Sequence, residues 1–449
     1  MNLLRNQKLI FLALYLISGA VLLATIYLPK NPRDISWLQY ILVFLSFLFL
    51  TRYFVYMVIS PWYDTACDIW RKKNQALVDA YRPYVSVIIP AWNEAVGIIS
   101  TVESVLASTY DNLEIIVVND GSTDESDELL KNFVKEFERA PLEGKTITYL
   151  YKENGGKGTA LNRGIEVSSG EIIVSIDADC LVHKEAITHF VTSFADPRVM
   201  AAVGNVKVAH TGSFLATVQS LEFLFSFYLK RADALLGSIY IIGGAAGAFR
   251  KEIFDRLGLY STENITEDIE LSIRIQKAGY KIAFASDAVV YTEGANTLNG
   301  LLKQRLRWKR GRMDTFIEHG DLFFSTKRKH NKFLSWVVLP FAVFGDTTLF
   351  LEIPFITFLL VYAFLSSDFT PFAAAILIVS LVFFVRSFTR DSKYDHKHAY
   401  LIAPIAWIMF YVVMAVEVNA LVKSLWGLLR NKEVVWQRWE RTGISTSQK

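Results

Sequence analysis

The chain has 449 residues, enough for a sizeable folded domain and further segments. Hydrophobic residues make up 52% of it and aromatic residues 14%, which is high for a purely soluble protein. The net charge of +3 is too small to indicate a nucleic-acid partner, and no basic patch interleaved with aromatic residues appears. Cys67 and Cys180 lie far apart in sequence, so the composition excludes a disulfide framework and a cysteine metal motif.

Two apolar runs open the chain. Residues 9–28 contain no charged residue, and residues 37–60 contain only Arg52. Each run is long enough to cross a bilayer. A signal peptide is the alternative for the first run, but it lacks a clear small-residue cleavage site and a second apolar run follows. We therefore expect a transmembrane hairpin over residues 1–60.

The composition changes over residues 61–83, which we interpret as a juxtamembrane linker. Basic and aromatic residues gather in this stretch: Arg71, Lys72, Lys73 and Arg82 beside Trp62, Tyr63 and Trp70. Basic residues next to a span mark the cytoplasmic side of a membrane. The domain that follows is therefore predicted to be cytoplasmic.

Residues 84–300 alternate between expected strands and helices. Strands are predicted over residues 85–89, 113–118, 146–150 and 171–179. This alternation predicts an α/β domain with a mostly parallel sheet covered by helices. The carboxyl ends of the strands should then gather at one edge, where open α/β sheets bind ligands.

The fourth expected strand ends in two carboxylates, Asp177 and Asp179. Two interpretations explain this pair equally well: a solvated turn, or a binding site for a hard divalent cation that carries phosphates. Asp120 follows the second strand and Lys157 follows the third. Because these loops should converge at one edge of the sheet, the pattern favours a metal and phosphate site.

Two later stretches of this domain are candidates for ligand contact. A helix predicted over residues 214–236 precedes the glycines of residues 243–247, which permit close approach to a ligand or simply a tight connection. Glu267 and Asp268 begin a helix that Gly279 ends. Acidic residues in a first turn need no function, because the helix dipole favours them.

Residues 301–332 form a predicted interfacial region. Six basic residues surround Trp308 over residues 303–312, which fits a basic helix attracted to anionic lipid. Gln304, Arg307 and Trp308 also lie three and four positions apart, on one helical face. That face offers an amide, a guanidinium suited to phosphate and an indole suited to sugar or base stacking.

Residues 333–430 become apolar again in three segments, expected to be transmembrane, and a polar tail follows over residues 431–449. Asp346 and Glu417 at membrane depth indicate a hydrated interior or pairing with Arg52 or Arg386. Basic residues in the tail indicate a cytoplasmic location, whereas three spans after a cytoplasmic domain would place the tail outside. Whether the number of C-terminal spans is odd or even therefore stays open.

The sequence contains one ordered set of motifs: Asp120, Asp177-Ala-Asp179, Thr266-Glu267-Asp268 and Gln304-x-x-Arg307-Trp308. In this order they resemble the processive family-2 membrane glycosyltransferases, which include cellulose, chitin, hyaluronan and poly-N-acetylglucosamine synthases. The likeness covers residues 85–308 and looks strongest to the bacterial poly-β-1,6-N-acetylglucosamine group. It implies a GT-A type nucleotide-diphospho-sugar transferase domain, Rossmann-like and inserted between transmembrane helices.

The resemblance implies roles on the donor side of the site. Ala91, Glu94 and Asp120 would contact the uridine of a UDP-sugar. Lys157, Gln304 and Arg307 would hold its diphosphate. Asp177 and Asp179 would bind the nucleotide side and the Mg²⁺ or Mn²⁺ ion.

The resemblance also implies roles on the acceptor side. Trp308, Gly244 and Glu267 would contact the acceptor sugar. Asp268 would be the general base that takes a proton from the acceptor hydroxyl. The reaction needs that base and an electrophile for the departing diphosphate, but not the acid/base carboxylate pair of a hydrolase.

The implied function is processive, inverting transfer from a UDP-sugar, most like UDP-N-acetylglucosamine, to a β-linked biofilm exopolysaccharide that is exported. The implied partners are the UDP-sugar, the growing polysaccharide, the lipid bilayer and a small membrane subunit, with no nucleic acid. The chain would lie in the inner (plasma) membrane with several spans and a cytoplasmic catalytic domain.

Other activities remain open. A hyaluronan, chitin or glucan type synthase would use the same residues. A non-processive transferase with a lipid-linked acceptor would normally lack Gln-x-x-Arg-Trp. A channel or scaffold subunit with an inactive transferase domain is disfavoured because every carboxylate of the motif set is present.

Overall fold

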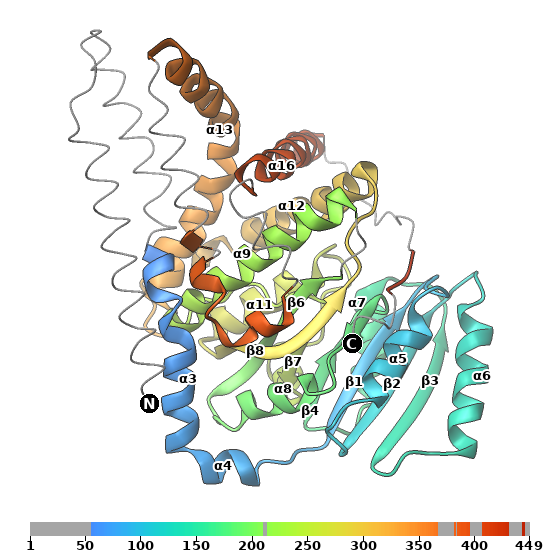
Figure 1. Cartoon of the computed structure of the whole chain (residues 1–449). Coiled ribbons are helices and arrows are strands. Elements are labelled where there is room, and N and C mark those ends of the chain that lie inside the picture. The colour runs from blue at the N-terminus through green and yellow to red at the C-terminus, as the bar shows by residue number, and fades with distance from the viewer. Residues whose placement is uncertain are drawn as a thin grey trace.

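The computed structural model describes residues 55–209, 213–366, 381–382, 384–395, 406–430 and 442–444. Its centre is an eight-stranded sheet with the strand order β3-β2-β1-β4-β7-β6-β8-β5 (Figure 1). The hairpin expected over residues 1–60 lies outside the described residues apart from residues 55–60. Much of the second apolar segment expected after the domain also lies outside them.

The first half of the sheet is parallel, as the alternating sequence predicts. β1 and β2 are buried along their whole length, which suits apolar strands covered on both faces. Helices connect successive strands in this half. The elements are β1 (Val85–Ala91), α5 (Ile98–Leu106), β2 (Leu113–Asp120), α6 (Ser126–Arg139), β3 (Lys145–Lys152), α7 (Lys157–Val167) and β4 (Ile172–Ser175).

The second half makes the whole sheet mixed. β7 (Gly247–Arg250) runs antiparallel between β4 and β6 (Val199–Val208), and β5 (Cys180–Val182) runs antiparallel to β8 (Lys281–Thr292). Gly247 pairs with Ser175, the last residue of β4. The chain therefore enters β7 at the carboxyl end of β4 and must run back along it. The expectation of a mostly parallel sheet holds for the first half.

Helices cover both faces of the sheet. Side chains of α5 and α8 (Ala186–Phe194) pack in the hydrophobic core on one face. Side chains of α7, α10 (Glu252–Leu257) and α11 (Glu267–Ala278) pack in the core on the other. The carboxyl ends of β1, β2 and β4 consequently open at one edge between the two helical layers.

α9 (Phe214–Leu236) has the bounds that its apolar spacing predicts. The Ser213 hydroxyl caps its start by accepting the N–H of Ala216 at 3.0 Å. Gly237 ends it with a φ of 66°, a backbone conformation that glycine adopts without strain. α9 packs against β6 and β8 on one side and against α16 on another.

α12 (Leu298–Glu318) carries the Gln-x-x-Arg-Trp motif and lies against α16 (Ala406–Leu429) (Figure 1). α13 (Leu339–Ser366) leads away from the sheet. Among the described residues, Tyr411–Leu429 is the one helical stretch long and apolar enough to span a membrane, and Leu334–Phe350 is a shorter apolar stretch. The remaining short elements are α3 (Trp62–Lys73), α4 (Gln75–Ala80), η1 (Gly320–Leu322), η2 (Leu334–Val338) and η3 (Arg390–Tyr394).

A buried cluster of charges joins α3, α9 and the segment around η3. Arg231 of α9 contacts Asp64 of α3 at 2.6 Å and also pairs with Asp391 of η3. Arg386 lies 2.5 Å from Asp391. The suggestion that Arg386 neutralises acidic residues of the apolar helices is therefore wrong, because it is paired with Asp391 and Asp395.

Candidate active site

Loops at the carboxyl ends of β1 and β2 are joined by side-chain hydrogen bonds. The side-chain oxygen of Asn93, whose φ is 55°, accepts the N–H groups of Thr123 at 2.7 Å and Asp124 at 3.2 Å. The N–H of Glu94 donates to the Ser126 hydroxyl at 3.0 Å. These bonds fix the loop that follows β1 against the loop that follows β2.

Asp120 is buried at the end of β2 and organises the neighbouring loop. Its carboxylate accepts the N–H groups of Gly155 at 3.0 Å and Gly156 at 2.8 Å, and it pairs with Lys152 at 2.5 Å. Gly156 has a φ of 91°, which a side chain would strain. Asp120 thereby sets where α7 begins, and Lys157 is the first residue of that helix.

Lys157 connects the end of β4 with the start of α11. Its Nζ lies 2.5 Å from Asp177 Oδ1 and 3.5 Å from Glu267 Oε1. Burial alone would lower the pKa of Lys157, but the carboxylates of Asp177, Glu267 and Asp268 raise it above its ordinary value. Lys157 is therefore a fixed positive charge between the two acidic motifs.

Asp268 lies in the first turn of α11 and is held by two backbone donors. Its Oδ2 accepts the N–H of Gly244 at 2.7 Å, and its Oδ1 accepts the N–H of Ile269 at 2.8 Å. These bonds and the helix N-terminus stabilise the negative charge of a carboxylate. Burial, reinforced by Asp268, raises the pKa of Glu267, with Lys157 acting against it, so Glu267 ionises less readily.

One cavity of about 630 Å³ brings the motifs together. A volume of this size is typical of ligand sites, about 300–1,000 Å³. Most of the predicted site residues line it: Lys157, Asp177, Asp179, Gly244, Glu267, Asp268, Gln304, Arg307 and Trp308. The predicted convergence at one edge is confirmed for the loops after β3 and β4, which meet α11 and α12 at this cavity, whereas Asp120 does not line it.

The basic residues of α12 that line this cavity fall into two kinds. Arg305 pairs with Glu222 at 2.6 Å, Lys309 with Glu417 at 2.6 Å, and Arg312 with Asp346 at 2.5 Å. Arg307 has no carboxylate within 4 Å in the part of the chain that the structure describes. Three of these basic side chains therefore balance carboxylates inside the protein, and the one unpaired cavity-lining cation of α12 among the described residues is Arg307 of the motif. The attraction of this helix to lipid stays a prediction.

Trp308 is supported by residues that the sequence did not single out. The Arg305 guanidinium lies 4.6 Å from the Trp308 ring centroid, and the Phe223 ring lies 6.4 Å from it. Glu222 holds Arg305 through two bonds of 2.7 and 2.6 Å. Neighbours of a motif tryptophan on a distant helix carry no signal in one sequence, so Glu222 and Phe223 could not be found there.

α11 and α12 pack closely where their motifs lie. A Cβ on Gly311 of α12 would collide with the Thr266 side chain. The Asn264 amide also donates to the Thr315 hydroxyl at 3.0 Å. The glycine therefore allows the Thr-Glu-Asp turn to lie against the Gln-x-x-Arg-Trp helix.

Three predicted donor-site residues do not line the cavity. Ala91 and Asp120 are buried at the ends of β1 and β2. Glu94 lines a small adjoining recess with Asp179, so Asp179 faces both spaces. The uridine contacts expected of these three residues stay predictions.

The polar tail reaches this recess. The N–H groups of Thr442 and Gly443 donate to the Glu293 carboxylate at 2.7 and 3.2 Å. Gly443 and Ile444 line the recess beside Asp179. The sequence gives no signal for this contact, because Glu293 lies far from residues 442–444 along the chain.

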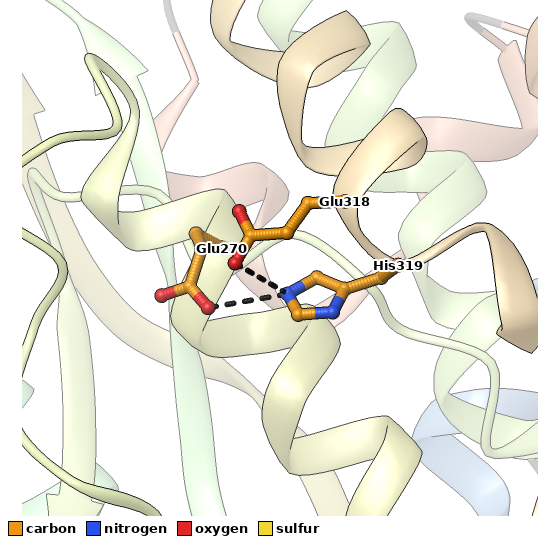
Figure 2. A group of neighbouring side chains, drawn as sticks. All are labelled: Glu270, Glu318 and His319. Carbon is orange, nitrogen blue, oxygen red and sulfur yellow. Dashed lines mark hydrogen bonds and ion pairs between the residues drawn. The ribbon is translucent and has the colours of Figure 1, made fainter.

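Glu270, Glu318 and His319 form the one group of three possible metal ligands found within the described ranges (Figure 2). His319 Nε2 lies 3.2 Å from Glu270 Oε1 and 3.9 Å from Glu318 Oε1. The same Glu270 oxygen lies 2.6 Å from the Arg274 guanidinium, whose charge opposes a cation. The group instead ties α11 to the end of α12, outside the cavity.

Asp177 and Asp179 fit a divalent cation better. Both lie just beyond β4 and line the cavity, and carboxylate oxygens are the ligands that Mg²⁺ and Mn²⁺ prefer. The Ala178 carbonyl between them accepts the Thr101 hydroxyl at 2.8 Å, which fixes their turn. The donor set is thus suitable, with Lys157 as the present partner of Asp177.

The comparisons with known proteins agree with this geometry. The model of the family "Glycosyl transferase family 2" matches residues 86–258. A poly-beta-1,6-N-acetyl-D-glucosamine synthase of Staphylococcus epidermidis is 28% identical over 358 residues, 76% of this chain and 84% of that protein. A synthase of the same name from Staphylococcus aureus (strain COL) is 32% identical over 246 residues, 54% of this chain and 57% of that protein.

A solved structure shows the fold. The mannosyltransferase PcManGT from Pyrobaculum calidifontis, in complex with GDP-Man and Mn²⁺, aligns with a TM-score of 0.52 at 20% identity, covering 84% of this chain and 99% of that one. The expected GT-A fold is confirmed, with a mixed sheet. Residues 86–258 match a family 2 glycosyltransferase domain, and the chain is similar to the poly-beta-1,6-N-acetyl-D-glucosamine synthases.

Proposed function

We propose that the chain transfers N-acetylglucosamine from UDP-N-acetylglucosamine to a growing β-1,6-linked polysaccharide, processively and with inversion at the anomeric carbon. One observation carries the proposal: a single cavity is lined by Asp179, Asp268, the unpaired Arg307 and Trp308. Those side chains supply what binding a nucleotide diphosphate and deprotonating a sugar hydroxyl require. The names of the relatives support the choice of sugar.

In the proposed reaction, Asp268 takes the proton of the acceptor hydroxyl as its oxygen bonds to the anomeric carbon of the donor. The bond between that carbon and the β-phosphate oxygen breaks, and UDP leaves. Attack from the face opposite the leaving group inverts the configuration. The hydrogen bond from the Gly244 N–H fixes the orientation of the Asp268 carboxylate. Lone pairs of the carboxylate that accept no backbone N–H can take the acceptor proton.

The leaving diphosphate is stabilised from two sides. Arg307 has no carboxylate within 4 Å among the described residues and offers a planar fork of N–H donors that matches phosphate oxygens. Gln304 lines the same cavity, and its side-chain NH₂ group would donate to a phosphate oxygen. A divalent cation held by Asp177 and Asp179 would neutralise charge on the diphosphate when bound.

We further propose that residues 84–300 are a cytoplasmic catalytic domain inserted between transmembrane helices of a multi-pass inner-membrane protein, and that the polymer is exported. The cavity lining includes Glu417 of α16, which lies within the apolar stretch Tyr411–Leu429. The cavity therefore extends from the catalytic motifs to an apolar helix, which supports a path for the product along that helix. A small membrane subunit remains a candidate partner for completing it.

The test uses the full chain purified in detergent with a panel of UDP-sugars and Mg²⁺ or Mn²⁺. We expect a polymer from UDP-N-acetylglucosamine alone, which a β-1,6-specific hexosaminidase degrades. Product length separates processive synthesis from the addition of single sugars. Polymer from UDP-glucose or from UDP-glucuronic acid would contradict the proposed sugar, and no polymer from any donor would contradict the activity.

A further inference from the structure

Lys230 is a cavity-lining lysine that none of the motifs includes. It lies near the end of α9, and its Nζ donates a hydrogen bond to the Ile241 carbonyl at 3.1 Å. Ile241 belongs to the same loop as Gly244, whose N–H holds Asp268. Lys230 therefore lies on the side of the cavity that contains the proposed general base.

Lys230 has no carboxylate within 4 Å in the described ranges, whereas three other lysines of the catalytic domain and α12 do. Lys157 lies 2.5 Å from Asp177, Lys207 lies 3.6 Å from Asp391, and Lys309 lies 2.6 Å from Glu417. The Lys230 Nζ lies 4.9 Å from the Phe227 ring centroid. The Lys230 ammonium group therefore contacts the Ile241 carbonyl and the face of the Phe227 ring.

The pKa of Lys230 agrees with the lack of a carboxylate within 4 Å of its ammonium group in the described ranges. Burial lowers the pKa of Lys230 to about 8, although the charges of Asp233 and Asp268 act in the opposite direction. An ammonium group has three N–H donors, and one of them is used by Ile241. Because Lys230 lines the cavity, its other donors are available to the oxygen acceptors of a ligand bound there.

The position of Lys230 indicates that it would contact the acceptor sugar and not the diphosphate. The diphosphate is expected at Arg307 and Lys157, and Lys157 lies between Asp177 and Glu267. Lys230 instead donates to Ile241, in the loop whose Gly244 N–H binds Asp268. A sugar that presents its hydroxyl to Asp268 carries further hydroxyl and carbonyl oxygens on neighbouring atoms, and these are neutral acceptors for an ammonium group.

We propose that Lys230 is a specificity-determining residue, which donates a hydrogen bond to a hydroxyl or acetamido oxygen of the acceptor sugar and disfavours an acceptor that carries a protonated amine. This inference rests on the proposed function and adds to it the selection of an uncharged acceptor. The ammonium group attracts sugar oxygens and repels a glucosaminium group of the same charge.

The experiment compares Lys230→Met with Lys230→Arg in the full chain in detergent. Each variant is titrated with a β-1,6-linked N-acetylglucosamine pentasaccharide, with the same pentasaccharide after de-N-acetylation, and with UDP. Lys251→Met is the matched control, because Lys251 also donates to a backbone carbonyl, that of Ser168, but does not line the cavity.

We expect Lys230→Met to bind the acetylated pentasaccharide about tenfold more weakly, as the loss of a charged donor predicts, while its UDP affinity is unchanged. Its preference for the acetylated over the de-N-acetylated sugar should shrink, and Lys230→Arg should restore most of both effects. Equal pentasaccharide affinity, or a parallel loss of UDP affinity and thermal stability, overturns the inference. A wild-type chain that makes no polymer from UDP-N-acetylglucosamine instead contradicts the proposed function.

Discussion

The backbone N–H of Gly244 donates a hydrogen bond of 2.7 Å to the carboxylate of Asp268. The bond joins the loop before β7 to the first turn of α11, so the proposed base is aimed by a segment outside its own helix. A side chain at this position would also displace a residue of the site. A Cβ there would collide with Lys157 Nζ, which is held by Asp177 and Glu267.

Gly244→Ala should reduce catalysis without unfolding the protein. The colliding atom is the end of a flexible side chain, so the added methyl group is expected to push Lys157 away from Asp177. A displacement of about 1 Å in a catalytic site can cost about a hundredfold in rate. The measurement is kcat for polymer synthesis with the thermal midpoint alongside, and Gly243→Ala is the control, because a Cβ there meets nothing within 4 Å. Equal activity of the two variants would speak against this role of Gly244.

Asp268→Asn should abolish polymer synthesis and leave UDP binding nearly intact. The amide keeps the shape of the carboxylate but cannot take the acceptor proton, and a general base contributes about 10²–10⁴-fold to rate. Synthesis is followed by release of UDP, and binding by titration calorimetry with Mg²⁺ present. A variant that turns over like the wild type would remove Asp268 from the mechanism.

Asp179→Ala should weaken metal-dependent UDP binding. Loss of a residue that only supports a metal ligand already costs about 10–100-fold in metal affinity, so loss of the carboxylate itself should cost at least about tenfold. UDP is titrated with and without Mn²⁺. Glu318→Gln is the control, because it alters the Glu270–His319 group of Figure 2 and should leave UDP binding unchanged. If Glu318→Gln weakened metal-dependent UDP binding and Asp179→Ala did not, the metal would instead bind the group of Glu270, Glu318 and His319.

Arg307→Met and Arg305→Met should have different effects, although the two residues are nearly adjacent. Arg307 has no carboxylate partner in the described structure, so its loss should weaken UDP binding by about ten- to a hundredfold and leave the thermal midpoint unchanged. Arg305 balances Glu222, and its loss should destabilise the fold by about 3 kcal/mol, the lower end of the range for breaking a buried ion pair. Denaturation and UDP titration of both variants separate the effects, and matching profiles would contradict the assignment.

Gly311→Ala should disturb the contact between α11 and α12, because its Cβ would collide with the Thr266 side chain. The turn that contains Asp268 would then have to shift. We expect lower stability and lower kcat, whereas Gly320→Ala, whose Cβ meets nothing within 4 Å, should behave like the wild type. Normal kcat in Gly311→Ala would show that the two helices tolerate a wider spacing.

Local patterns predicted the elements that carry the site. Apolar spacing gave α9 its bounds because Ser213 and Gly237 mark its ends within the same stretch. The loops after parallel strands placed Lys157 and Asp177 at one edge, as strand geometry requires. These inferences needed only the alternation of strands and helices.

Long-range pairing explains what the sequence could not predict. The basic residues of α12 resembled a lipid-attracted cluster, because their partners Glu222, Asp346 and Glu417 lie on other helices. The carboxylate of Asp120 accepts the N–H groups of Gly155 and Gly156, which no local pattern indicates, while its contact with a uridine stays a prediction. In both cases the charge was recognised, but its partner depended on the tertiary fold.

The ion pairs of Arg231 with Asp64 and Asp391 join the catalytic domain to the segments on both sides of it. A fragment limited to residues 84–300 would keep the arginine and lose both carboxylates. Leaving one member of a buried ion pair without its partner costs about 3–5 kcal/mol, a large part of the stability of a typical domain. Expression of the isolated domain should therefore fail or require replacement of Arg231, so biochemical work on this enzyme should begin with the full chain.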